Sequence, residues 1–186
     1  MSAPAPDVSW ALTWEDDVTL DEHAALAVLF SRCYPNSRTP FTGFRSWSSG
    51  RPELRIIGRD GPRIVAHAGV LRRFLQADDH GQLVGDVGLV GTDPAVQGSG
   101  AGAELMRRVA GALRALEIPF GFLTCGEHVA GFYARAGWER VDNPTRMVRA
   151  DGRVQVYGGV SMVLPVCAPI TAWPAGVQVD RNGLEV

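Results

Sequence analysis

The sequence predicts a mixed α/β fold in which a central sheet carries helices on both faces. Two observations lead to this fold class. Apolar residues recur at helical spacing in the central segments, and short β-type runs precede and follow each of these segments. The first β-type runs can also pair as a meander. No repeat, low-complexity tract or linker divides the chain, so we expect residues 1–186 to form one domain, with residues 1–7 flexible.

Each predicted element has its own signal. We expect helices over 20–30, 102–116 and 130–135, and strands over 8–13, 54–58, 63–74, 83–90, 120–125, 153–157, 161–166 and 176–179. The first helix opens with an acidic turn, and either Thr19 or Asp21 can cap it. The third helix stops before Gly137, which suits a helix end. In the strand over 83–90, Gly85 and Gly88 indicate a bulge or a close backbone approach.

Composition excludes several classes of protein. Hydrophobic residues make up 46% and charged residues 20%, which is typical of a soluble globular chain. Lys plus Arg is 18 and Asp plus Glu is 20, so no basic excess points to nucleic acid or to an anionic membrane. No apolar run is long enough for a bilayer, and the N-terminus lacks secretory-signal features. The cysteines at 33, 125 and 167 fit neither a disulfide framework nor a zinc spacing, so we expect a cytoplasmic protein without a metal site.

The clearest motif is a glycine-rich loop between a predicted strand and a predicted helix. It reads Gln97-Gly98-Ser99-Gly100-Ala101-Gly102. The glycines leave backbone N–H groups unshielded, and the helix directs its N-terminal dipole at them, so the loop suits a phosphate. The P-loop needs a Gly-Lys-Ser/Thr ending, and the dinucleotide fingerprint needs G-x-G-x-x-G in the first βα unit. The chain has neither, and a plain glycine-rich turn is the remaining structural alternative.

The loop resembles the Gln-x-x-Gly-x-Gly pyrophosphate loop of the GCN5-related N-acetyltransferase (GNAT) superfamily. A second segment, Phe132-Tyr133-Ala134-Arg135-Ala136-Gly137-Trp138, is similar to that superfamily's Phe-Tyr-x-x-x-Gly-Phe/Trp motif. The resemblance implies a mostly antiparallel sheet and an acyl-coenzyme A (acyl-CoA) donor. It implies that Tyr133 protonates the departing thiolate. The donor-binding residues that it implies are Val90, Gly91, Thr92, Gln97, Gly98, Ser99, Gly100, Ala101, Gly102 and Phe132; the first three pair with pantetheine and polarise the thioester carbonyl.

A narrower resemblance covers nearly the whole chain and involves the NodA nodulation N-acyltransferase family. It rests on ordered blocks that include Pro40-Phe41-Thr42-Gly43-Phe44-Arg45-Ser46-Trp47, Ala66-His67-Ala68-Gly69 and Asp180-Arg181-Asn182-Gly183. NodA proteins move a fatty acyl group from an acyl carrier protein to the free amine of a chitooligosaccharide. A looser likeness to aminoglycoside 2′-N-acetyltransferases lies around His67. The NodA resemblance implies that Trp47, Arg51 and Glu53 shape the acceptor pocket, with Trp47 stacking on a sugar ring; surface ion pairs are the alternative.

Amide formation needs a neutral amine, a polarised carbonyl and a protonated leaving thiolate. Asp86 lies in an apolar strand, where a carboxylate is costly to bury. We expect it to meet the amine as general base, in line with the superfamily; a structural acid paired with an arginine is the alternative. His67 is a second candidate base because its ordinary pKa is about 6.5, although a satisfied core histidine is also common. Cys125 lacks the Asp or Asn partners of a nucleophile.

Together these features predict an N-acyltransferase that transfers an acyl group from acyl-CoA to a primary amine in a ternary complex. We expect the amine to belong to an amino sugar or an aminoglycoside-like metabolite. The intact loop favours CoA, because a carrier protein presents pantetheine without a free pyrophosphate. Two alternatives stay open: NodA-type transfer from acyl carrier protein to a glucosamine-type acceptor, and a non-catalytic acyl-CoA sensor. Tyr133 and Asp86 argue against the sensor. A homodimer is left open; nucleic acid, a metal and membrane insertion are not expected.

Overall fold

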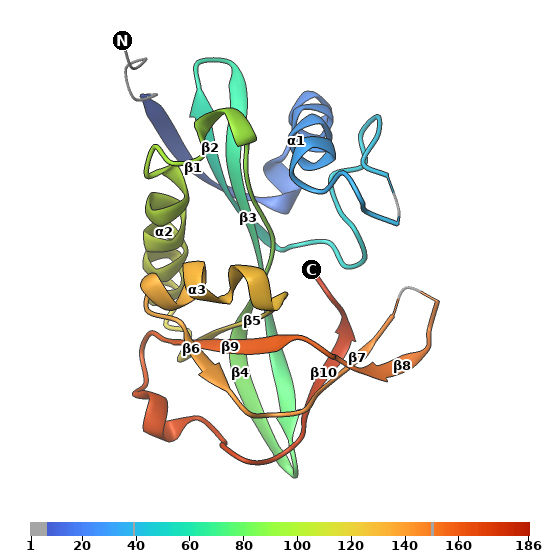
Figure 1. The fold of residues 1–186 in the computed structure, drawn as a ribbon, viewed down its shortest axis with the longest axis vertical. Coiled ribbons are helices and arrows are strands. Elements are labelled where there is room, and N and C mark those ends of the chain that lie inside the picture. The colour runs from blue at the N-terminus through green and yellow to red at the C-terminus, as the bar shows by residue number, and fades with distance from the viewer. Residues whose placement is uncertain (1–6, 39, 150) are drawn as a thin grey trace.

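The computed structural model describes residues 7–38, 40–149 and 151–186, in which ten strands form one sheet (Figure 1). The strands are β1 (Val8–Trp14), β2 (Leu54–Asp60), β3 (Arg63–Ala77), β4 (His80–Thr92), β5 (Phe120–Cys125), β6 (Glu139–Val141), β7 (Thr145–Val148), β8 (Val154–Val156), β9 (Val160–Pro165) and β10 (Val179–Leu184). The helices are α1 (Leu20–Cys33), α2 (Ala101–Ala115) and α3 (Glu127–Arg135), with 3₁₀ turns η1 (Glu15–Asp17), η2 (Pro94–Val96) and η3 (Ile170–Ala172). Of the segment expected to be flexible, residues 1–6 lie outside the described residues.

The first four strands form an antiparallel meander in the order of the chain. β5 pairs in parallel with β4, and β9 and then β6 continue the sheet in antiparallel pairing. Near the turn of the long β3–β4 hairpin, β10 pairs with β3. β7 then pairs with β10, and β8 pairs with β7 (Figure 1). The predicted mixed, mostly antiparallel sheet is therefore confirmed.

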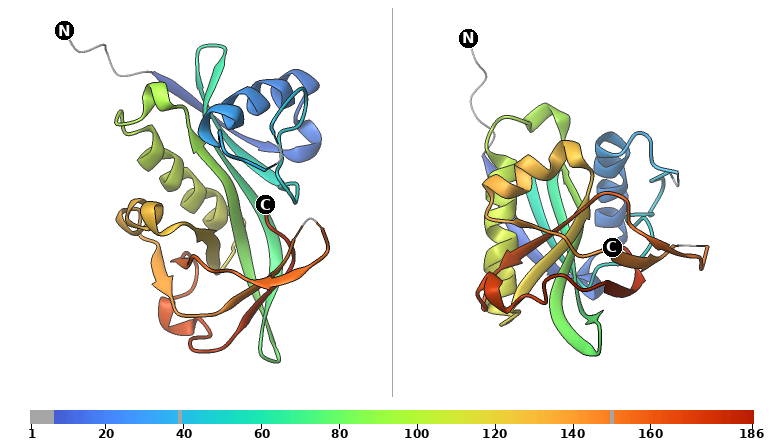
Figure 2. Two further views of the ribbon diagram at one scale, coloured as in Figure 1. Left: turned by 45° about the vertical axis from the view of Figure 1, so that its right-hand side comes forward. Right: turned by 60° about the horizontal axis from the view of Figure 1, so that its bottom comes forward.

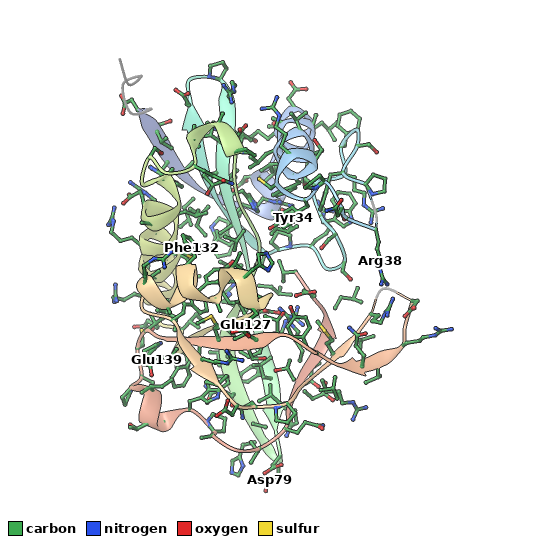
Figure 3. All side chains as sticks on the ribbon, viewed as in Figure 1. Tyr34, Arg38, Asp79, Glu127, Phe132 and Glu139 are labelled. Carbon is green, nitrogen blue, oxygen red and sulfur yellow. The ribbon has the colours of Figure 1, made fainter. Side chains whose placement is uncertain are left out.

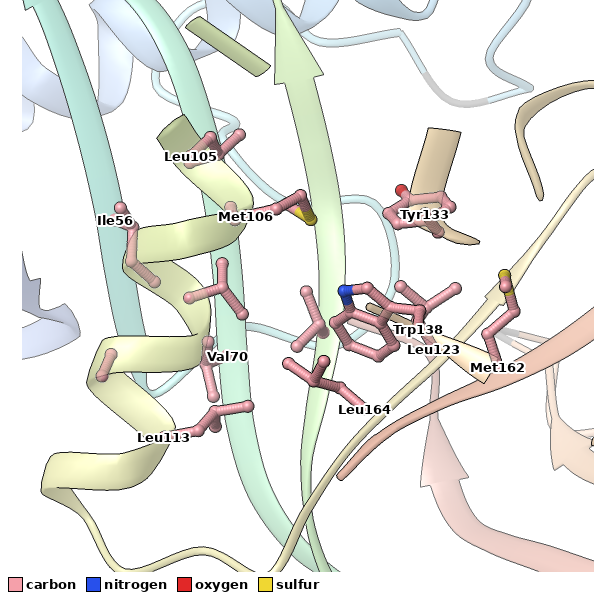
Figure 4. Packing of buried hydrophobic residues seen from close by; sticks show 14 of the residues in the cluster. Ile56, Val70, Leu105, Met106, Leu113, Leu123, Tyr133, Trp138, Met162 and Leu164 are labelled. Atoms are coloured by element: carbon pink, nitrogen blue, oxygen red, sulfur yellow. The ribbon is translucent and has the colours of Figure 1, made fainter. Parts of the chain in front are cut away.

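Helices cover both faces of this sheet, as the sequence predicts (Figure 2). Successive residues of a strand point to opposite faces, so neighbours on β2 enter different layers. Ile57 packs in the cluster under α1, whereas Ile56 packs in the cluster under α2. α3 closes the second layer, where the buried ring of Trp138 lies among Leu123, Leu164 and the side chains of α2 (Figure 4).

Several element boundaries differ from the prediction. Thr19, not Asp21, caps α1, through a capping box with Glu22. α3 begins at Glu127, three residues before the expected start, because Gly126 serves as its N-cap. The expected strand over 176–179 is wrong: the strand in this region, β10, only begins at Val179. β6 and β7 were not expected, since both are short and carry exposed charged residues that hide an apolar pattern.

Two paired glycines let α2 approach the sheet closely. Gly85 of β4 and Gly121 of β5 are register partners, and Leu113 of α2 packs against both. A Cβ atom added at Gly85 would lie 2.1 Å from Cδ2 of Leu113, far inside van der Waals contact. The close backbone approach expected at Gly85 is thus used for helix packing.

We predict that Gly85→Val destabilises the fold. The added side chain must displace the fully buried Leu113, so the free energy of unfolding should fall by about 1–3 kcal/mol in urea denaturation. The control is Gly111→Ala in the middle of α2, where an added Cβ meets nothing within 4 Å. This change should raise the free energy of unfolding by about 0.5–1 kcal/mol. A Gly85→Val protein as stable as the wild type would contradict this account of the helix–sheet contact.

Candidate active site

A cavity opens where β4 and β5 separate. Their pairing ends at Asp86 and Phe122, although β4 continues to Thr92 and β5 to Cys125. The resulting space, which we call the β4–β5 cavity, has a volume of about 690 Å³. Its lining includes Cys33, Tyr34, Ser48, Leu89, Val90, Gly91, Thr92, Gln97, Thr124, Cys125, His128, Tyr133, Tyr157 and Glu185. The expected pantetheine-binding stretch of β4 therefore forms one wall of a real cavity.

A β-bulge shapes this wall. The β3–β4 register shifts between His67 and Gly69, so that β4 holds one extra residue opposite β3. Leu89, in the bulge, has a left-handed φ of 50°, which is unusual for a residue with a side chain. Its carbonyl accepts a hydrogen bond of 2.9 Å from Nδ1 of His67, and the Tyr34 hydroxyl donates to the next carbonyl, that of Val90, at 2.5 Å. These two bonds stabilise the irregular backbone from the α1 side.

His67 is fully buried and does not line the β4–β5 cavity. Arg55, which has only donors, lies with Nη1 3.2 Å from Nε2 of His67, so Nε2 accepts and Nδ1 carries the hydrogen. Burial, aided by the Arg55 charge, lowers the pKa of His67 to about 3. Glu15 in turn holds Arg55 through two hydrogen bonds. This geometry favours a neutral histidine that supports the bulge over a histidine that takes protons from a substrate.

Asp86 is also fully buried and lies behind the cavity wall. Arg181 of β10 donates to both of its carboxylate oxygens, at 2.9 and 2.5 Å, and Nε of Arg73 lies 3.1 Å from one of them. Burial alone would lower the pKa of Arg181, but the charges and hydrogen bonds of Asp86 and Glu185 raise it. The arrangement fits the arginine-paired alternative, and the general-base role of Asp86 stays a prediction that this geometry does not favour.

The glycine-rich loop over 97–102, which we call the phosphate loop, keeps several backbone donors free, although the N–H groups of Ser99 and Ala101 have acceptors within it or just before it. Gly98 and Gly100 adopt left-handed φ angles of 80° and 94°, and an added Cβ at either would meet nothing within 4 Å. Gly100 is the N-cap of α2 and offers no side-chain bond. Within the described residues, no acceptor is recorded for the N–H groups of Gly98, Gly100, Gly102 and Ala103. Ser99 and Ala101 complete the loop, and Gln97 links it to the β4–β5 cavity. The loop can therefore receive an anion at the start of α2.

Tyr133 and Phe132 both come from α3 but have different surroundings. The Tyr133 ring is buried, lines the β4–β5 cavity, and has no hydrogen-bond partner for its hydroxyl among the described residues. Burial, together with the nearby Cys125 and Tyr157, raises the pKa of Tyr133, so its proton is retained. Phe132 (Figure 3) packs against the start of α2, where a Cβ at Gly102 would lie 3.2 Å from its ring. Phe132 thus supports the loop rather than the cavity.

The expected acceptor residues form a separate surface cluster. The guanidinium of Arg51 lies 4.9 Å from the centre of the Trp47 ring, and Arg51 is ion-paired with Glu15 at 2.7 Å. Glu53 is ion-paired with Arg72. None of the three expected residues lines the β4–β5 cavity, and Arg51 occupies one face of the Trp47 ring that a sugar would need. Their acceptor role stays a prediction.

Sequence reasoning missed several cavity residues. Four of them come from different parts of the chain: Tyr34 directly follows α1, Thr124 lies on β5, Tyr157 directly follows β8 and Glu185 directly follows β10. No local motif marks them, because each reaches the site through long-range packing. Gly88 illustrates this point: an added Cβ there would lie 2.2 Å from a main-chain oxygen of Val186. The close backbone approach that the sequence indicates at Gly88 is made by the C-terminal segment.

The described residues contain neither a metal-binding cluster nor a membrane-spanning helix. No group of three or more His, Cys, Asp or Glu side chains there is arranged to hold a metal ion. No helix in the same residues is long and apolar enough to cross a membrane.

Comparisons with known proteins agree with this arrangement. The family model for nodulation protein A (NodA) matches residues 5–186. The nodulation protein A of Mesorhizobium plurifarium is 38% identical over an alignment of 193 positions, which covers 96% of this chain and 98% of the relative. Two solved structures share the fold. An acyl-CoA N-acyltransferase from Pseudomonas aeruginosa has a TM-score of 0.59 and 22% identity, and the alignment covers 85% of this chain and 99% of that one. A GNAT family N-acetyltransferase (YhbS) from Escherichia coli in complex with CoA has a TM-score of 0.62 and 12% identity, with 97% and 92% covered.

The buried, neutral His67 predicts a pH dependence of stability. Its folded pKa of about 3 lies below the ordinary value of 6.5. Between these values the unfolded chain binds a proton that the folded chain does not, so stability rises with pH across this window and is complete above it. In His67→Asn, the amide can still donate to Leu89, and the free energy of unfolding should change less between pH 5 and pH 7.5 than in the wild type.

Urea denaturation at the two pH values measures this difference. The control is His80→Asn, at an exposed histidine of the β3–β4 hairpin, which should leave the wild-type dependence unchanged. Equal pH dependence in the His67→Asn protein and the wild type would show that His67 titrates normally.

Proposed function

The chain belongs to the nodulation protein A family of N-acyltransferases, and we propose that it transfers an acyl group from acyl-CoA to the primary amine of an amino sugar. The observation that carries this proposal is that Gln97 lines the β4–β5 cavity and is also the first residue of the phosphate loop. One ligand can thus place a phosphate at the start of α2 and a thioester beside Tyr133. Since the chain is an enzyme, we drop the sensor alternative.

The donor half of the site suits acyl-CoA. In the proposal, the free N–H groups of the loop bind the pyrophosphate, and Val90, Gly91 and Thr92 pair with the pantetheine amides as an added strand would. The backbone N–H groups at the bulge polarise the thioester carbonyl. The YhbS structure, which has the same fold and was solved in complex with CoA, supports this placement. An acyl-CoA donor also implies a reaction in the cytoplasm.

The chemical step is direct attack of the amine on the thioester. The C–N bond forms as the C–S bond breaks, and the sulfur leaves as a thiolate that needs a proton. Tyr133 is suited to supply it, because its hydroxyl lines the cavity without another hydrogen-bond partner among the described residues and its raised pKa means that it carries a proton when the reaction begins. No covalent acyl-enzyme is needed. Burial and the nearby Glu127 raise the pKa of the cavity cysteine, Cys125, which makes it a poor nucleophile.

A second candidate donor is an acyl carrier protein, which family membership favours. A carrier protein is acidic and would need a cationic docking patch. All basic residues of this chain are arginines, and its adjacent arginine pairs are already engaged: Arg72 with Glu53, Arg73 with Asp86, and both Arg107 and Arg108 with Glu104. Because these arginines are already paired with carboxylates, they do not form a cationic docking patch. We therefore prefer acyl-CoA over the carrier protein as the donor.

A donor comparison tests the proposal. The same acyl group is presented on CoA and on a carrier protein, with a glucosamine-type amine as acceptor, and the product is measured by mass spectrometry. We expect the higher kcat/KM with acyl-CoA. In Gly100→Val, a side chain intrudes where the pyrophosphate binds, so kcat/KM for acyl-CoA should fall about 10–100-fold through lost charged hydrogen bonds.

The control for this experiment is Gly61→Val, in the turn between β2 and β3. Gly61 also has a left-handed φ, 56°, and open space around it, so this variant too places a side chain on left-handed backbone but leaves the loop intact. Gly61→Val should keep the wild-type kcat/KM. A wild-type preference for the carrier-bound donor would favour the carrier-protein alternative, and no acylated amine with either donor would refute the proposed function.

We further predict that Tyr133→Phe lowers kcat by about 10²–10⁴, the usual contribution of a general acid, with CoA affinity unchanged in calorimetry. The loss should shrink with a donor that carries the same acyl group on a more acidic aryl thiol, because that thiolate leaves without a proton. An equal loss with both thioesters would mean that Tyr133 acts by packing and not by proton transfer.

A further inference from the structure

Glu185 places a carboxylate on the wall of the β4–β5 cavity, directly after β10. One of its oxygens, Oε1, accepts a hydrogen bond of 2.7 Å from the Thr124 hydroxyl and one of 3.2 Å from Arg181. The other oxygen, Oε2, has no partner among the described residues. The side chain keeps 41% of its surface exposed. Glu185 therefore offers the cavity a fixed carboxylate with a free oxygen.

The backbone at this position is held from three directions. The Gly50 N–H donates to the carbonyl of Glu185 at 2.7 Å. Arg73 donates to the carbonyls of Arg181 and Leu184, at 3.1 and 2.7 Å. The next residue, Val186, is buried against the glycine gap at position 88. A carboxylate anchored in this way is preorganised for a reaction in the cavity, unlike an exposed side chain on a mobile tail.

The charges around Glu185 balance. Arg73 and Arg181 bring two positive charges, and Asp86 and Glu185 bring two negative ones. Arg181 donates from Nε and Nη2 to Asp86, and from Nη1 to Thr124 and Glu185. The cluster thus holds Glu185 in place without a surplus of positive charge that would repel a cationic amine. In this cluster Asp86 is a positioning residue.

We propose that Glu185 binds the acceptor's amino group through Oε2 and is the base that takes its proton during acyl transfer. This assignment rests on the proposed function. As the neutral amine attacks, its nitrogen gains positive charge and becomes far more acidic than a free ammonium, so a carboxylate suffices to remove the proton. The C–N bond forms, Glu185 takes one proton from nitrogen, the C–S bond breaks, and Tyr133 gives one proton to sulfur. Exchange with solvent returns one proton to Tyr133 and removes one from Glu185.

Glu185→Gln tests the assignment, because glutamine can still accept from Thr124 but cannot take a proton. We expect kcat to fall about 10²–10⁴-fold, with CoA affinity unchanged in calorimetry. The matched control is Glu139→Gln, at an exposed glutamate on β6 (Figure 3), which should have wild-type kcat. Glu185→Asp, which keeps the charge at a shorter reach, should recover part of the loss.

The outcomes separate this assignment from the proposed function. If the wild type acylates no amine, the proposed function fails. If the wild type is active and Glu185→Gln has wild-type kcat, even with a raised KM for the amine, Glu185 is not the proton acceptor. Should Glu185→Gln fail to fold, Thr124→Val carries the test: it keeps the carboxylate but removes the shorter of the two hydrogen bonds to Oε1, and we expect kcat to fall about tenfold with CoA affinity retained. Unchanged kcat in that variant would also overturn the assignment.

Discussion

The buried ion pair between Asp86 and Arg181 stands at the point where the sheet divides. Asp86 is the last residue of β4 that pairs with β5, and the cavity begins with the next residue along the strand. Both partners are fully buried, so their desolvation is costly and only the close, two-oxygen geometry offsets it. The pair joins β10 to the middle of the sheet, and the wall that carries Glu185 depends on this junction.

A second buried network lies further along β4, on the same face of the sheet as Asp86. Glu15 holds Arg55, Arg55 holds His67, and His67 holds the carbonyl of Leu89 in the bulge. The bulge turns the strand away from regular pairing, while the Asp86 cluster fixes the strand just before it. The buried polar groups of both networks must all be satisfied, and each network then admits few alternative arrangements. The irregular stretch from Leu89 to Thr92 is consequently rigid without being paired to β5.

The parts of the site that follow local rules could be predicted from the sequence. A glycine-rich loop before a helix and an aromatic pair on the next helix are both short-range signals, and the structure places the loop at the start of α2 and Tyr133 on the wall of the β4–β5 cavity. Asp86 shows the limit, because its partner Arg181 lies 95 positions away and nothing in the strand identifies it. Glu185 was missed for the same reason: its significance depends on Thr124 and Arg181, which only the folded sheet brings together.

The two ion-pair networks beside β4 take their positive charges from guanidinium groups alone, and the sequence contains no lysine anywhere. An arginine cation stays protonated at any physiological pH and is a poor nucleophile. A lysine ε-amine beside a bound thioester would instead compete with the acceptor for the acyl group. Because its fixed positive charges are all arginines, the protein presents no lysine amine to the proposed acyl donor, and acylation of its own lysines cannot occur.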